Sequence, residues 1–193
     1  MNTAAFTTPQ QNLERLLNVQ KAAHLAQGPL DAETRIAWLD RVIGLMVDHK
    51  DDIVAAVNED FGNRSATATL LADVFAVISS LKFARESLRE WMKPETFDAQ
   101  FPDAVARVEY QPLGVVGILS PWNFPFNLIF APLAGVIAAG NRAIIKPSEF
   151  TPACSELTRK MIASAFDESE IAVVTGDAAV AAHFATLPFD HLL

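Results

Sequence analysis

The chain has 193 residues, of which 51% are hydrophobic and 20% are charged, and its formal net charge is −8. This composition favours a folded protein with a buried core. The negative charge argues against nucleic-acid binding, because neutralising phosphates needs clustered Lys and Arg. With one cysteine and no basic or apolar leader segment, the chain is expected in a reducing cytoplasm without an internal disulfide.

The first hundred residues are predicted to be helical and carry no obvious chemistry. Thr8-Pro9-Gln10-Gln11 is typical of a helix start, with a threonine cap, a proline in the first turn and a glutamine that completes a capping box. Further helices are expected from Asp31, from Asp51 to about Phe61, and over 65–92. In the longest helix, helical spacing predicts a buried stripe of Leu71, Val74, Phe75, Ile78, Leu81, Leu88 and Trp91.

The second half alternates between short apolar runs and helical patterns. An exposed strand is expected over 104–110, and buried strands over 115–119, 143–146 and 171–174. Helices are expected over 126–139, 152–166 and 177–185, and Pro188-Phe189-Asp190-His191-Leu-Leu is expected to be the start of a fourth strand. Repeated strand–helix–strand units predict a parallel sheet with helical crossovers, and this sheet is expected to be incomplete.

An uncharged segment between Tyr110 and Arg142 is the part of the sequence most informative about function. Its length would suit a membrane span, but four prolines interrupt it, so a buried strand–loop–helix unit is the better interpretation. The loop presents Asn123, and the next apolar run ends at Lys146 and Glu149. Because carboxyl ends of parallel strands share one edge of a sheet, we expect a ligand site there.

Three motifs agree in order and spacing with one known family. They are Gly117-Ile-Leu-Ser-Pro-Trp-Asn-Phe-Pro, Ala138-Ala-Gly-Asn and Lys146-Pro-Ser-Glu. With them the chain resembles the amino-terminal half of the aldehyde dehydrogenase superfamily, from its first helix onward. Gln111-Pro-Leu-Gly-Val-Val and Pro188-Phe-Asp-His look like the class 3 branch, and bacterial coniferyl aldehyde dehydrogenases are the nearest resemblance within it.

The resemblance implies a fold and a division of the chain. The fold class is α/β, with amino-terminal helices followed by an incomplete parallel Rossmann-like sheet. Residues 1–103 would form a helical amino-terminal region, and residues 104–193 a partial, truncated dinucleotide-binding domain. An unrelated flavodoxin-like domain is the alternative, but it leaves the helical first half and the Pro-Trp-Asn-Phe-Pro loop unexplained.

The resemblance also implies roles for individual residues. Asn123 matches the family's oxyanion-hole asparagine, although a turn asparagine bonded to its own backbone is the ordinary alternative. Lys146 and Glu149 match residues that contact the adenosine ribose, with Ser148 between them, although an exposed ion pair would give the same pattern. The carboxylate of Glu149 would bind ribose hydroxyls and disfavour a 2′-phosphate, so NAD is the favoured cofactor and NADP the alternative. Ser120, Pro121 and Trp122 match the loop beside the nicotinamide, and core packing is an equally good account of Trp122.

The family's nucleophilic cysteine and general-base glutamate are expected beyond Leu193. Cys154 does not stand in the family's cysteine motif and is interpreted as an ordinary helix cysteine, and the four histidines have no metal-site spacing. The parent protein would therefore oxidise an aldehyde, with coniferyl aldehyde as the nearest candidate, and assemble as a homo-oligomer. This chain alone would be inactive. A non-catalytic module that binds a cofactor or a partner is the alternative.

Overall fold

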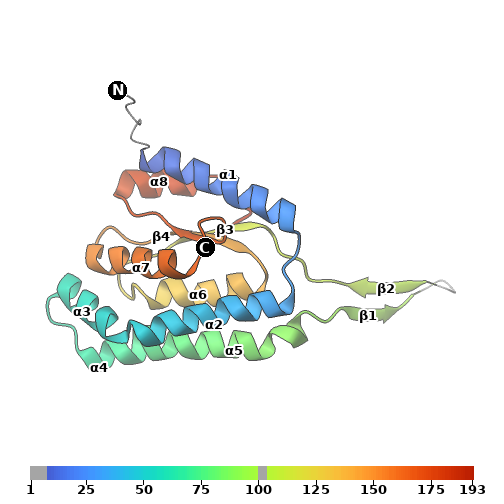
Figure 1. Cartoon of the computed structure of the whole chain (residues 1–193), viewed down its shortest axis with the longest axis horizontal. Coiled ribbons are helices and arrows are strands. Elements are labelled where there is room, and N and C mark those ends of the chain that lie inside the picture. The colour runs from blue at the N-terminus through green and yellow to red at the C-terminus, as the bar shows by residue number, and fades with distance from the viewer. Residues whose placement is uncertain (1–7, 100–103) are drawn as a thin grey trace.

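The computed structural model describes residues 8–99 and 104–193 (Figure 1). The first part of the chain forms α1 (Pro9–Gln27), α2 (Ala32–Asp48), α3 (Lys50–Phe61), α4 (Ala66–Thr69), the π-helical segment η1 (Leu70–Phe75) and α5 (Ala76–Trp91). The second part forms α6 (Asn127–Ala138), α7 (Pro152–Ala165) and α8 (Ala178–Thr186). The strands are β1 (Glu95–Asp98), β2 (Val105–Val108), β3 (Val115–Leu119), β4 (Arg142–Lys146), β5 (Ile171–Val173) and β6 (His191–Leu192).

The four later strands form a parallel sheet with the order β5-β4-β3-β6. Strand β3 pairs with β4 in a register that places Leu119 opposite Lys146. The predicted α/β class is therefore confirmed, and so is the prediction that the loops after β3 and β4 leave the same edge. The segment between Tyr110 and Arg142 is a strand, a loop and α6, so a single membrane-spanning helix is the wrong interpretation of it.

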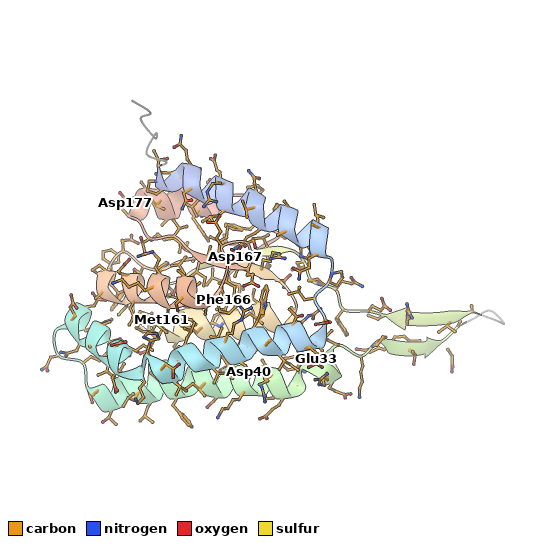
Figure 2. All side chains as sticks on the ribbon, viewed as in Figure 1. Glu33, Asp40, Met161, Phe166, Asp167 and Asp177 are labelled. Atoms are coloured by element: carbon orange, nitrogen blue, oxygen red, sulfur yellow. The ribbon has the colours of Figure 1, made fainter. Side chains whose placement is uncertain are left out.

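Both faces of the sheet are covered by helices (Figure 1). Successive residues of a strand point to opposite faces, so Val115 packs against α1 and α8 while Val116 packs on the other side. On that second side α6 and α7 cover the sheet, and α2 and α5 form a further layer beyond them. Side chains fill the space between these layers, including Met161 and Phe166 of the α7 region (Figure 2).

An antiparallel hairpin of β1 and β2 projects from this body (Figure 1). The exposed strand β2 was predicted, whereas β1 was not. All residues of both strands are exposed, and the Tyr110 hydroxyl donates a 2.7 Å hydrogen bond to Glu95 at the hairpin's base. The predicted boundary between residues 1–103 and 104–193 borders the segment 100–103, which lies outside the described residues, so it stays a prediction.

The helix caps predicted from the sequence are confirmed at α1 and wrong or incomplete at α3 and α7. Thr8 and Gln11 form the predicted capping box of α1. The prediction that Asp51 caps α3 is wrong, because the helix begins at Lys50 and its capping residue, His49, makes no side-chain cap. Thr151 occupies the first cap position of α7, but its side chain does not accept a hydrogen bond from the helix.

The predicted buried stripe of the long helix is wrong in three places. Leu71, Phe75 and Trp91 are 61%, 65% and 45% exposed, whereas the buried face runs through Val74, Val77, Leu81, Ala84 and Leu88. Leu71 and Phe75 lie in the π-helical segment η1, whose wider turns break the 3.6-residue spacing assumed in the prediction, and Trp91 is the last residue of α5. By length and composition alone Ala66–Trp91 would also suit a membrane span, which is weak support because core helices of soluble proteins share these properties.

Candidate functional site

The carboxyl edge of the sheet gathers the two motif loops. The backbone N–H of Ser120, just after β3, donates a 3.1 Å hydrogen bond to the carbonyl of Lys146 at the end of β4. Both residues are buried. This bond extends the ladder between β3 and β4 by one residue, and it fixes where the loop 121–126 and the loop 147–151 leave the sheet.

The loop after β3 presents exposed side chains on a restrained backbone. Pro121, Trp122 and Asn123 are exposed, and Trp122 lies beside Phe61 with ring centroids 6.2 Å apart. Trp122 is 51% exposed, so core packing does not explain it. Within residues 8–99 and 104–193 the Asn123 side chain forms no hydrogen bond, so the turn-asparagine alternative has no supporting contact there.

Lys146 and Glu149 form an ion pair that is buried at one end and open at the other. The Lys146 ammonium is fully buried and donates to the carbonyl of Pro147 at 2.8 Å and to Glu149 Oε2 at 3.0 Å. The Glu149 side chain is 29% exposed. Its pKa is lowered, first by its own backbone N–H and then by Lys146, so the carboxylate stays ionised at neutral pH.

A cavity of about 330 Å³ opens beside Glu149. It is lined by Pro147, Ser148, Glu149, Pro152, Ser155, Glu156, Thr175, Gly176 and Asp177. Two of the predicted cofactor residues, Ser148 and Glu149, therefore line this cavity. Lys146 does not line it but donates a hydrogen bond to Glu149, which does. Ser120, Pro121 and Trp122 do not line it. The sequence reasoning missed residues 175–177, although they follow the third parallel strand and the same edge argument would have found them.

One wall of this cavity is the start of α7, which a distant residue caps. Asp60 of α3 accepts the backbone N–H groups of Ala153 and Cys154 at 3.0 and 2.8 Å. The pKa of the buried Cys154 thiol is raised, first by burial and then by Asp60. A raised pKa keeps the thiol protonated and unreactive, which agrees with the interpretation of Cys154 as an ordinary helix cysteine.

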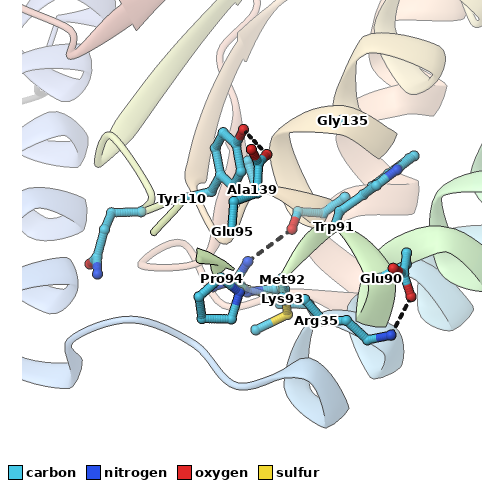
Figure 3. Close-up of a pocket in the computed structure, with 12 residues that line it drawn as sticks. Arg35, Glu90, Trp91, Met92, Lys93, Pro94, Glu95, Tyr110, Gly135 and Ala139 are labelled. Carbon is cyan, nitrogen blue, oxygen red and sulfur yellow. Dashed lines mark hydrogen bonds and ion pairs between the residues drawn. The ribbon is translucent and has the colours of Figure 1, made fainter. Parts of the chain in front are cut away.

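A second and larger cavity lies elsewhere, at the base of the hairpin (Figure 3). It measures about 740 Å³ and is bordered by the end of α5, the hairpin and the end of α6, close to where β4 begins. Its charged groups are already paired, since Lys93 contacts Glu90 and Tyr110 contacts Glu95. The buried Arg35 guanidinium donates to the carbonyls of Leu30 and Ala138. None of the predicted site residues lines this cavity.

Two residues from the helical half also reach the loop of Asn123. Arg64 donates to the main-chain carbonyl of Asn123 at 3.0 Å and pairs with the buried Asp73 at 3.2 Å. Sequence reasoning described this half as chemically quiet and missed both residues. No local pattern could have found them, because the contact joins positions 59 residues apart.

The model of the aldehyde dehydrogenase family matches residues 3–188 of this sequence. The chain therefore belongs to the aldehyde dehydrogenase family, as the motifs of the two carboxyl-edge loops predicted. The flavodoxin-like alternative is excluded by the same match.

Two curated relatives and one solved structure match most of this chain. Coniferyl aldehyde dehydrogenase of Pseudomonas sp. strain HR199 is 52% identical over 95% of this chain and 38% of the relative. A probable coniferyl aldehyde dehydrogenase of Caulobacter vibrioides is 56% identical over 92% of the chain and also 38% of the relative. The substrate-bound structure of Staphylococcus aureus AldH superposes with a TM-score of 0.88 at 31% identity, over 93% of this chain and 40% of that one. The chain thus spans about two fifths of the length of these relatives.

Proposed function

We propose that this chain forms the amino-terminal part of an NAD-dependent aldehyde dehydrogenase, here called the parent enzyme, which oxidises an aldehyde to its acid. The observation that carries the proposal is the shared carboxyl edge, where the loop of Asn123 and the Lys146–Glu149 loop leave neighbouring parallel strands beside a cavity. Membership of the family supports the reaction class.

Asn123 supplies a hydrogen-bond donor for the substrate oxygen. When a thiolate from the rest of the parent attacks the aldehyde carbonyl, negative charge develops on that oxygen. The exposed Asn123 amide, with no other partner in the described parts of the chain, donates to this charge as it forms. Because the donor is neutral and held on a restrained loop, it stabilises the transition state with little reorganisation.

The cavity beside Glu149 holds the adenosine side of the dinucleotide. An ionised carboxylate at its rim accepts hydrogen bonds from ribose hydroxyls, and the buried Lys146 fixes the position of that carboxylate. The donor set therefore fits NAD, because a 2′-phosphate would meet the negative charge of Glu149. When bound, the nicotinamide accepts the hydride that leaves the substrate. Ser120, Pro121 and Trp122 lie in the loop that leads from β3 to Asn123, and we assign them to the nicotinamide side of the cofactor.

Coniferyl aldehyde is the substrate that we propose for the parent, because relatives with 52% and 56% identity carry that name. We also propose that the parent is a homo-oligomer. Support comes from the projecting hairpin, on which Phe97, Val105 and Val108 expose apolar side chains at 54%, 81% and 46%. The cytoplasmic location expected from the sequence stays a prediction.

The test is turnover by the purified parent enzyme. Supplied with coniferyl aldehyde, it is expected to reduce NAD faster than NADP at equal concentrations and to release the acid. A simple aliphatic aldehyde serves as the comparison substrate. A folded parent that reduces neither nucleotide with either aldehyde would overturn the proposed reaction, and a preference for NADP would overturn the role given to Glu149.

A further inference from the structure

A buried carboxylate lies under the loop that presents Asn123. Asp73, in the π-helical segment η1, is fully buried, and its Oδ1 accepts the backbone N–H groups of Phe126 and Asn127 at 3.3 and 3.1 Å. These groups open α6, which has no side-chain cap of its own. Asp73 therefore caps α6 from a helix more than fifty positions earlier in the chain.

Arg64 joins this carboxylate to the loop itself. One guanidinium nitrogen lies 3.2 Å from Asp73 Oδ2, and the other donates to the main-chain carbonyl of Asn123 at 3.0 Å. The guanidinium also lies over the rings of Phe61 and Phe124, 5.2 and 4.8 Å from their centroids. A single side chain, 17% exposed, thus contacts the loop at Asn123 and at the next residue.

The π-helical geometry of η1 is part of this arrangement. The carbonyl of Ala72 accepts a 2.5 Å hydrogen bond from the Asn127 side chain, so the segment that carries Asp73 is bonded to α6 at two neighbouring residues. π-Helical turns are often found at functional sites. A buried ion pair contributes little net stability, because desolvation opposes its attraction. Burial accordingly raises the pKa of Asp73, and the Asn127 N–H and the Arg64 charge oppose that rise.

We propose that Arg64 and Asp73 are positioning residues that fix the backbone of Asn123, so that its side-chain amide meets the developing oxyanion. This inference rests on the proposed role of Asn123. The reason is geometric: an oxyanion donor must be held within a few tenths of an ångström, yet the Asn123 side chain is exposed and has no other partner in the described residues. The position of the Asn123 side chain is therefore set by the main chain of the loop. Arg64 and Asp73 fix that main chain through their hydrogen bonds to it.

The experiment measures single-turnover acylation and the Michaelis constant for NAD in the parent enzyme. Arg64→Met is expected to slow acylation by ~10-fold, because the Asn123 amide is misplaced but still present. The Michaelis constant for NAD should stay unchanged. Arg64→Lys should recover only part of the acylation rate, because a single ammonium cannot reproduce both contacts of the planar guanidinium. Arg85→Met is the matched control, because Arg85 forms an exposed 2.6 Å pair with Asp40 away from the loop.

A double variant separates positioning from general stability. Adding Arg64→Met to Asn123→Ala should cause no further slowing, because there is no side-chain amide left to position. A further ~10-fold loss would show that Arg64 acts independently of Asn123 and would overturn the proposal. If Asn123→Ala alone leaves acylation unchanged, the proposed oxyanion role fails first, and the positioning role falls with it. Should Arg64→Met fail to fold, Asp73→Asn keeps the shape and one acceptor oxygen, and the same double-variant comparison applies to it.

Discussion

Replacing Glu149 by glutamine tests how the chain selects its cofactor. Gln keeps the size and an acceptor oxygen of the side chain but removes the charge next to the buried Lys146. A hydrogen bond to a charged group contributes about 1.5–3 kcal/mol and a neutral one about 0.5–1.5 kcal/mol. The difference of about 1 kcal/mol predicts a roughly 5-fold weaker binding of NAD to the parent enzyme.

The opposite effect is expected for NADP. The 2′-phosphate no longer meets a carboxylate in Glu149→Gln, so NADP should bind more tightly while NAD binds less tightly. The ratio of the two dissociation constants should then move by about 10-fold or more, and isothermal titration with each nucleotide measures it directly.

Glu156→Gln is the matched control for this test. Glu156 lines the same cavity but is already paired with Arg159 at 2.7 Å. Its replacement should therefore leave the ratio of the NAD and NADP dissociation constants close to that of the unmutated parent enzyme. An unchanged ratio in Glu149→Gln, or an equal change in Glu156→Gln, would refute the assignment of selectivity to Glu149. Because Lys146 would keep its buried charge without a counter-ion, Glu149→Gln should also unfold at a lower denaturant concentration.

The remaining predictions concern the chain itself. Alone, it should not reduce NAD with any aldehyde, and its only cysteine, the buried Cys154, should react with a thiol reagent only in denaturant; fast labelling of the native chain would contradict this. The pKa of Glu149 is lowered from its ordinary value of 4.5, so the stability of its ion pair should persist above that value and disappear as pH falls through the lowered pKa, as acid titration would show. Gly140→Ala should lower the unfolding free energy by about 1–3 kcal/mol. Gly140 has a φ of +82°, and an added Cβ would lie 2.6 Å from the Arg35 guanidinium carbon. Gly44→Ala, in the interior of α2 with open space around it, should be neutral or stabilising.

The parts of the fold that follow from local signals were predictable from the sequence. Strands β3 and β4 contain short apolar runs and end at Leu119 and Lys146, and parallel pairing then dictates that their loops share one edge. The capping box at Thr8 is equally local. These signals predicted that the two motif loops meet at the carboxyl edge, and they do, whereas the site itself and the roles of its residues stay predictions.

What the sequence did not reveal depends on distant contacts and irregular geometry. The hydrogen bond from Arg64 to the carbonyl of Asn123 forms only when the helical half packs on the loop. The π-helical segment η1 changes which side chains of the long helix are buried, and a fixed 3.6-residue spacing cannot anticipate it. Strand β1 escaped because both of its faces are exposed, which leaves no apolar alternation to recognise.

The most direct test of the central claim is the single-turnover acylation rate of Asn123→Ala in the parent enzyme. If the Asn123 amide stabilises the oxyanion, the rate should fall by ~10²-fold or more, while the dissociation constant for NAD stays nearly unchanged because Glu149 and Lys146 are intact. Weaker NAD binding with an unchanged acylation rate would contradict the account, since it would place Asn123 in the cofactor site and leave the oxyanion without this donor.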